Sequence, residues 1–460
     1  MRAQMWGLNM HSSRHPALLT LFGLTCLLHC QLQVPGSLLD KVPGPEISGF
    51  SVNGIAGVIT GNRIHIDLRW RTETRNTDAA AITAAFIATA NIYVGNVKQV
   101  SGTTVNDFRT PQTYVAKAAD GIATQYIVTV LAGYPIADTG QNQCSDDTAI
   151  QTCATVSGTH PRQDADYVDA PRAPAYSGPT QHPVYTNDYT TTDNVTGLVW
   201  KTCSEGQIAP PCTNSPSLYT LSPDTTVCGA LNTANAGAGY AGLNNWRLPT
   251  IEELSTLALF DGSAPAINGT HFPSTGLGAY LSSTVSVASP TDGFRYLFNS
   301  GGIGTFPLTS SARLRCVSGG PATTRTPLFI ENGNGTISDR TNKLLWQKCS
   351  MGKNNDATCS GSATFVSWSN ALSYCQNLTL ANQTWRLPNY AELSSIADFS
   401  AANPAINATF FPGTMSAVYK SSTSTPGTPG NSFNVNFSSG AGSSNPKTNS
   451  NYVRCVASES

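Results

Sequence analysis

Cysteines are the residues of this chain whose spacing most directly suggests chemistry. Beyond the first 30 residues there are two sets of four and one local pair: Cys203, Cys212, Cys228 and Cys316, then Cys349, Cys359, Cys375 and Cys455, and Cys144 with Cys153. A cysteine acts as a nucleophile or a metal ligand only through a free thiolate. An even number in an exported chain instead indicates disulfides, so we expect all ten to be structural.

Other residue types offer little catalytic or metal chemistry. His65, His160, His182 and His271 are scattered one to a region, and a lone histidine is more often a hydrogen-bonded or surface residue than a ligand. The stretch ENGNGTISD fits a hairpin turn better than a calcium loop. Glu252 and Glu253 are adjacent on an expected helix, where side chains diverge by about 100°. The sequence therefore predicts no catalytic residue, no metal and no cofactor.

Composition excludes one class of partner and favours one compartment. Charged residues make up 12% of the 460 residues, and the formal net charge is −1. There is no basic stripe to neutralise phosphates, so nucleic acid is not an expected partner. Gly and Pro are frequent, and Ser, Thr and Asn separate short apolar runs, as is typical of extracellular, β-rich proteins.

The N-terminus predicts export. The apolar run ALLTLFGLTCLLHC spans residues 17–30, which suits a signal peptide and is too short for a stable membrane anchor. We place the signal segment at 1–30. Cys26 and Cys30 end the run, and either could carry a lipid; Cys30 is favoured because polar sequence follows it directly. The alternative is a plain secretory signal that is discarded with both thiols.

An internal repeat defines the second half of the chain. WRLPT at 246–250 returns as WRLPN at 385–389, and each copy is followed by PAIN, then YLSST or YKSST, and finally LRCV or VRCV. Matching blocks in the same order indicate duplicated domains, which we place at 186–320 and 325–458.

Within each copy the pattern predicts two short helices followed by strands. WSNALSYCQNL (368–378) places apolar residues on one helical face. A second helix begins at Pro249 and Thr250, and its counterpart begins at Pro388 and Asn389. Alternating stretches such as SFNVNFSSG read as strands. Each repeat is therefore expected to be an α+β domain.

The first half of the chain has a different residue pattern. Residues 44–132 contain Asn-Gly at 53–54 and Gly-Asn at 61–62, flanked by alternating apolar residues such as Ile64, Ile66 and Leu68. Short strands at regular spacing predict a β-sandwich. Residues 133–185, with the Pro-rich DAPRAPAYSGPTQHP, are expected to form a loop-rich linker.

These blocks resemble a known family. The ordered set TGLVW, NNWRLPTIEELSTL, PAIN, YLSST and LRCV, with its second copy, resembles the bacterial Lcl_C domain over about half of the chain. The RLPT-x-x-E and RCV pieces are also similar to the C-type-lectin-like fold shared with formylglycine-generating enzymes. Residues 47–130 resemble the Ig-like repeats of bacterial surface lipoproteins of the spirochaete type. Together the resemblances imply an Ig-like sandwich and two tandem α+β C-type-lectin-like domains.

The lectin-like resemblance also implies a pairing of the cysteines, which the sequence alone leaves open. Cys203–Cys212 and Cys349–Cys359 would close short loops. Cys228–Cys316 and Cys375–Cys455 would join the first helix to the last strand. With no thiol left over in the repeats, this pairing argues against a thiol-based catalyst. A thiol oxidase of the formylglycine type is the alternative function, which a free thiol in either repeat would favour.

The repeated Trp-Arg-Leu-Pro stretch is interpreted as structural. Trp246 and Trp385 would anchor a small core. Arg247 would pair with Glu253, and Arg386 with Glu392, in the helix that follows. The alternative is a Trp-Arg platform for a sugar ring or a sulfate.

The resemblance implies a surface protein, an adhesin that binds host matrix or glycans, attached to the membrane by a lipid. Ligand residues are expected on the loops 285–311 and 424–448, because binding residues gather on loops held by a rigid scaffold. Two weak sites could then gain avidity. A purely structural role in the envelope is the remaining alternative.

Overall fold

The computed structural model describes residues 44–68, 82–108, 112–131, 136–167, 171–221, 226–318 and 329–459. The expected signal segment, with Cys26 and Cys30, lies outside these residues, and the side chain of His65 is not described. Short strands make up most of the regular structure, which agrees with the β-rich composition. Within the described ranges, no helix is both long enough and apolar enough to cross a membrane.

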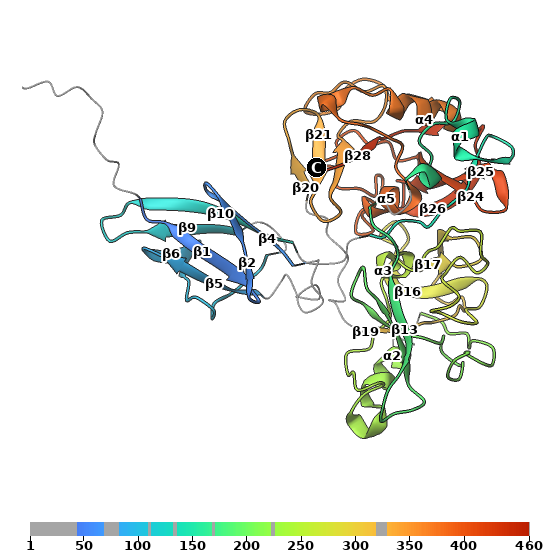
Figure 1. Cartoon of the computed structure of the whole chain (residues 1–460), viewed down its shortest axis with the longest axis horizontal. Helices are drawn as coiled ribbons and strands as arrows, with labels where there is room; N and C mark the ends of the chain where they lie inside the picture. The colour runs from blue at the N-terminus through green and yellow to red at the C-terminus, as the bar shows by residue number, and fades with distance from the viewer. Residues whose placement is uncertain are drawn as a thin grey trace, which may run out of the picture. The chain divides into compact units, whose positions relative to one another are not determined.

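Residues 47–131 form two β-sheets around one core, drawn in blue and cyan in Figure 1. Ile64, Ile66 and Leu68 are all buried, as their alternation predicts. Asn53 and Gly54 connect the first two strands with φ values of 49° and 77°, the backbone that a two-residue hairpin turn requires.

The two sheets of this domain differ in size. The smaller one has the order β2-β1-β5-β8, and its strands are Ile55–Ala56 (β2), Ile47–Val52 (β1), Ile82–Ala88 (β5) and Val105–Asn106 (β8). The larger one has the order β3-β4-β10-β9-β6-β7, and its strands are Val58–Thr60, Arg63–Asp67, Ala123–Leu131, Gln112–Lys117, Asn91–Val94 and Val97–Lys98. Strands β10 and β4 pair in parallel, and the other pairs are antiparallel.

The segment predicted as a linker is more than a connector. It carries a two-stranded hairpin, a turn of α-helix, a 3-10 turn and a longer strand: Cys144–Ser145 (β11), Ile150–Gln151 (β12), Cys153–Val156 (α1), Asp164–Asp166 (η1) and Tyr176–Gln181 (β13). Strand β13 pairs with the first strand of the first repeat, while residues 136–167 hydrogen-bond to the second repeat. The sequence suggests a loop here because the segment is rich in polar side chains. Their hydrogen-bond partners lie up to 302 positions away in the chain, so no local pattern reveals them.

The first repeat combines two sheets with short helices. One sheet runs β13-β14-β15-β19, with Tyr189–Asp193 (β14), Val199–Lys201 (β15) and Val317–Ser318 (β19). The helices are Thr226–Ala230 (α2), Leu231–Thr233 (η2), Asn235–Gly237 (η3) and Ile251–Ser255 (α3). The strands Ala279–Val285 (β16), Asp292–Leu297 (β17) and Gly302–Pro307 (β18) belong to the other sheet.

The second repeat follows the same plan. Its first sheet runs β20-β21-β22-β28, with Phe329–Glu331, Thr336–Asp339, Leu344–Gln347 and Val456–Ser458. The helices are Trp368–Gln376 (α4), which confirms the predicted helix, Leu380–Asn382 (η4) and Tyr390–Ser395 (α5). The remaining strands are Phe365–Val366 (β23), Val418–Thr425 (β24), Thr428–Asn436 (β25), Ala441–Pro446 (β26) and Asn451–Tyr452 (β27).

The two repeats are not separate domains joined only by the chain. A single eight-stranded sheet, β16-β17-β18-β26-β25-β24-β27-β23, passes from the first to the second through the pairing of β18 with β26. One apolar core contains residues of both repeats, among them Trp200, Phe294, Tyr390 and Phe433. The tandem domains therefore share one sheet and one apolar core.

Five disulfides join the pairs that the sequence and the lectin-like resemblance predict: Cys144–Cys153, Cys203–Cys212, Cys228–Cys316, Cys349–Cys359 and Cys375–Cys455. The two long bridges link the first helix of each repeat to its C-terminal part, across 88 and 80 positions.

Candidate functional site

Each tryptophan of the repeated stretch anchors a core. Trp246 is 2% exposed and Trp385 is fully buried. The indole of Trp246 donates to the carbonyl of Tyr240 at 2.9 Å, and that of Trp385 donates to the carbonyl of Leu380 at 2.8 Å. Neither ring offers a face to a ligand, so a Trp-Arg platform for sugars or sulfate is not available here.

Each arginine of the stretch forms a two-pronged ion pair with the glutamate of the helix. The two Nη atoms of Arg386 lie 2.5 and 2.6 Å from the Glu392 carboxylate, and those of Arg247 lie 2.6 and 2.7 Å from Glu253. Both glutamates are completely buried.

The same carboxylates also complete the helix starts. The backbone N–H of Thr250 donates to Glu253 at 2.8 Å, and that of Asn389 donates to Glu392 at 2.9 Å, each within a capping box. The stretch is repeated because it ties the helix start to the ion pair.

The described histidines are held by the protein itself. His271 Nδ1 lies 2.6 Å from the carbonyl of Gly178, and His182 Nδ1 accepts from the N–H of Tyr185 at 3.0 Å. His160 Nδ1 lies 2.9 Å from the Thr159 hydroxyl. Cys144, Cys153 and Asp166 cluster within 4.8 Å, but the two sulfurs are bonded to each other and offer no thiolate to a metal.

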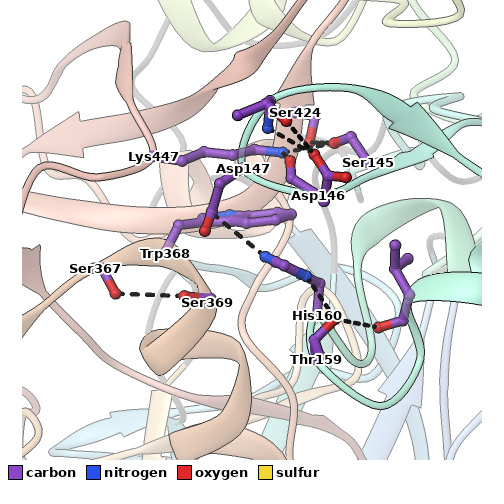
Figure 2. Close-up of polar contacts among 12 residues, drawn as sticks. Ser145, Asp146, Asp147, Thr159, His160, Ser367, Trp368, Ser369, Ser424 and Lys447 are labelled. Atoms are coloured by element: carbon purple, nitrogen blue, oxygen red, sulfur yellow. Dashed lines mark hydrogen bonds and ion pairs between the residues drawn. The ribbon is translucent and has the colours of Figure 1, made fainter.

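A buried lysine forms the polar centre where residues 136–167 meet the second repeat (Figure 2). Lys447 Nζ donates to Ser145 Oγ at 2.5 Å and to the Asp146 carbonyl at 2.9 Å. It also lies 3.6 Å from the centre of the Trp368 ring, a favourable place for a cation. Ser145 Oγ in turn lies 2.8 Å from Ser424 Oγ.

A hydroxyl next to an amine of low pKa is the arrangement of a nucleophile and its base. Burial lowers the pKa of Lys447 to about 7, so Lys447 and Ser145 resemble such a base and nucleophile. However, the backbone N–H of Ser145 donates to the Gln163 side chain at 3.0 Å, and that of Ser424 donates to the Gln141 side chain at 2.9 Å. These N–H groups therefore cannot form an oxyanion hole. The hydrogen bonds around Lys447 are therefore better suited to holding residues 136–167 against the second repeat than to catalysing acyl transfer.

The edge of the sheet in the second repeat forms an open groove. It lies among β23, β24, β25 and β27 and contains about 660 Å³ of empty space, part of it open to solvent. Phe365 and Tyr452 line it together with the amides of Asn436 and Asn451 and the hydroxyl of Ser438. An aromatic surface flanked by a few polar groups is the usual make-up of a small-ligand site.

The groove partly coincides with the expected ligand loops. Asn436 and Ser438 lie within the predicted 424–448, whereas Phe365, Asn451 and Tyr452 lie outside it. Sequence reasoning missed Phe365 and Asn451 because β23 and β27 are two-residue strands, too short for an alternation pattern to mark them. Tyr452 begins the terminal YVRCV, which the pattern predicts as a strand and not as a ligand loop. A comparison of the two repeats position by position would have marked them, since the first repeat has different residue types there.

Comparison with known proteins gives one strong match. The family model Lcl_C, described as the Lcl C-terminal domain, matches residues 189–318 and 335–457, which together are more than half of the chain. No curated protein matches the chain significantly. A crystal structure from Bacteroides thetaiotaomicron, described as a "putative glycoside hydrolase", is 14% identical over 65% of this chain and 88% of that one, with a TM-score of 0.17. That score is too low to indicate a shared fold or activity.

Proposed function

The chain belongs to the Lcl C-terminal domain family, and from that premise we propose that it is a non-enzymatic binding protein of the bacterial cell envelope whose ligand is a carbohydrate, free or in host matrix. The groove with its exposed aromatic residue is the observation that carries this proposal. The five disulfides support an exported location.

The proposal includes an assignment of the folds. The N-terminal pair of sheets is Ig-like, which its largely antiparallel strands around one core support. Each repeat is C-type-lectin-like, which the two short helices and the long bridge to the C-terminal part support.

A lipid on Cys30, or on Cys26, would attach the chain to the outer membrane and leave the repeats at the cell surface. A Cys30→Ser variant is then expected to leave the membrane fraction, with Cys26→Ser as the matched control. If both single variants and the double variant stay in the membrane fraction, the lipid anchor is wrong.

The binding function is tested with the full-length chain, exported and oxidised. We expect saturable binding to members of a panel of matrix proteins and glycans, equally with calcium and with chelator, and digestion of the chain by protease added to intact cells. Absence of binding across the panel would contradict the proposal and leave a structural role in the envelope. A titratable pair of thiols would favour the thiol oxidase, against the ten cysteines that the structure places in disulfides.

A further inference from the structure

We propose that the groove of the second repeat binds an uncharged sugar, and that the first repeat has no equivalent site. This inference rests on the proposed binding function and assigns to it one site and one class of ligand. It replaces the expectation of two similar sites that bind with avidity.

The aromatic wall of the groove is exposed and firmly held. Phe365 is 59% exposed, although a phenylalanine on a short strand would ordinarily be buried. Its ring meets that of Tyr452 at right angles, with centroids 5.8 Å apart, and Tyr452 lies 5.5 Å from the fully buried Tyr419. Rings fixed in this way offer contact area without a large loss of entropy on binding.

The polar wall contains an amide that lacks a protein partner. The Nδ2 atom of Asn451 is inaccessible to solvent and makes no hydrogen bond to the described residues. Leaving a buried donor unpaired costs about 1–3 kcal/mol, and such a donor calls for an explanation. Asn451 as a whole is half-buried, so a rotation of its side chain would bring this donor to the groove, where a sugar hydroxyl would accept from it. Nearby, Asn436 is already oriented, because its Oδ1 accepts from the N–H of Ser438 at 2.9 Å.

The charge of the lining narrows the class of ligand. None of the nine residues that line the groove is acidic or basic. Sulfated and carboxylated sugars are bound mainly by Arg and Lys, which form charge-assisted hydrogen bonds with their anionic groups. Aromatic rings together with amides and hydroxyls instead suit the apolar face and the hydroxyls of a neutral ring. The groove therefore matches hexoses and their N-acetyl derivatives.

The first repeat shows what the same position looks like without these groups. From the Trp-Arg-Leu-Pro stretch onward the copies are offset by 139 positions, so Asn451 corresponds to Ala312 and Tyr452 to Arg313. Between the short-loop cysteines and the helix cysteine the offset is 147, so Phe365 corresponds to Leu218. Leu218 is 59% exposed, like Phe365, but Ala312 and Arg313 replace the amide of Asn451 and the ring of Tyr452. The neighbouring Tyr219 packs against the core of the first repeat.

The test uses the full-length chain and four variants. Binding to immobilised glycans that end in glucose, galactose, mannose or N-acetylglucosamine is compared with binding to heparin. We expect saturable binding to at least one neutral glycan and a loss of at least tenfold in affinity with Phe365→Ala and with Asn451→Ala. The first-repeat variants Leu218→Ala, at the position of Phe365, and Arg313→Ala, at the position of Tyr452, should bind like the wild type. Thermal unfolding of each variant shows whether a loss of binding comes from misfolding.

Each other outcome overturns a different statement. If the wild type binds neutral glycans and the second-repeat variants bind equally well, the groove is not the site, while the binding function stands. If it binds heparin alone, the ligand class is wrong. If Leu218→Ala or Arg313→Ala also loses affinity, the restriction to one repeat is wrong. If no glycan and no matrix protein binds, the proposed function itself fails.

Discussion

Ile303 of the first repeat pairs with Gly442 of the second across an antiparallel bridge, and the two residues occupy the same position in their repeats, 139 apart. The aromatic contacts repeat this symmetry. Phe260 packs on Phe433 at 4.7 Å, and their counterparts Phe399 and Phe294 pack at 4.8 Å. Such reciprocal contacts define an isologous interface, so the two repeats pair as the subunits of a symmetric dimer do, within one chain.

The departure from symmetry at this bridge leads to the first prediction. A Cβ on Gly442 would collide with the ring of Tyr390, whereas the first repeat has isoleucine at both equivalent positions, Ile303 and Ile251. We expect Gly442→Ile to lower the free energy of unfolding by about 1–3 kcal/mol through overpacking. Tyr390→Ile should relieve this, because the pair then resembles that of the first repeat.

A double-mutant cycle in chemical denaturation measures this effect, and it should yield a coupling free energy of about 1 kcal/mol or more. Purely additive costs would show that Tyr390 does not occupy the space above Gly442. Ile303→Val is the control on the other side of the bridge, with an expected cost of about 0.5–1.5 kcal/mol.

Features that depend on nearby residues or on the repeat itself could be predicted from the sequence. The Asn53–Gly54 turn and the helix starts at Thr250 and Asn389 follow from local backbone chemistry. The disulfide pairing follows from the spacing of the cysteines in two parallel sets, and the lectin-like resemblance supports the long bridge of each set. The repeat boundaries followed from matching blocks, and the family match to 189–318 and 335–457 lies within them.

Features that depend on distant contacts could not be predicted. Nothing local to residues 136–167 shows that Ser145 will meet Ser424, or that Thr423 will donate to Asp164. One signal was available, however. Lys420 and Lys447 stand where the first repeat has Leu281 and Leu308. Leu281 is buried and Leu308 is half-buried. A change from leucine to lysine at both positions of one copy indicates a new polar partner, and that partner is the segment read as a linker.

The second prediction concerns the ion pairs of the repeated stretch. Glu392→Gln leaves the Arg386 guanidinium buried without its counter-charge, which should cost about 3–5 kcal/mol of unfolding free energy. Glu253→Gln should cost less, because the Arg247 side chain is 17% exposed and that of Arg386 is 5% exposed. Urea denaturation of both variants compares the two sites. If Glu253→Gln lowers the free energy of unfolding as much as Glu392→Gln or more, burial of the arginine does not determine the loss of stability.

The third prediction is a pH dependence that arises from Lys447. Its pKa falls from 10.5 to about 7 because of burial, against the opposing effect of Asp147 and Asp146. Between about pH 7 and 10.5 the unfolded chain therefore binds more protons at this position than the folded chain does, and the free energy of unfolding rises with pH in that window. Below about pH 7 both forms are protonated, and the slope from this lysine vanishes.

The control for this slope comes from the first repeat, where Leu308 takes the equivalent position. Lys447→Leu should flatten the rise between pH 7 and 10 and leave a smaller slope from Lys420, whose pKa burial lowers to about 8. The charged groups near Lys447 are Asp147, Asp146 and Lys420, and His160 in turn contacts Asp147. The stability curves of wild type and variant are therefore measured in the same buffers. An unchanged slope would show that Lys447 is not the titrating group.

The last prediction separates the two kinds of disulfide. Loop-closure entropy grows with the number of residues enclosed, so in that model removing Cys375–Cys455, with a separation of 80, should cost about 4.5 kcal/mol. Removing Cys349–Cys359, with a separation of 10, should cost about 2.7 kcal/mol. Double Cys→Ala variants avoid free thiols, and chemical denaturation compares them. Because Cys375 and Cys455 are both fully buried in the core of the second repeat, lost packing adds to the larger figure. A smaller cost for the long bridge would show that the folded state, and not the unfolded chain, governs what these bridges contribute.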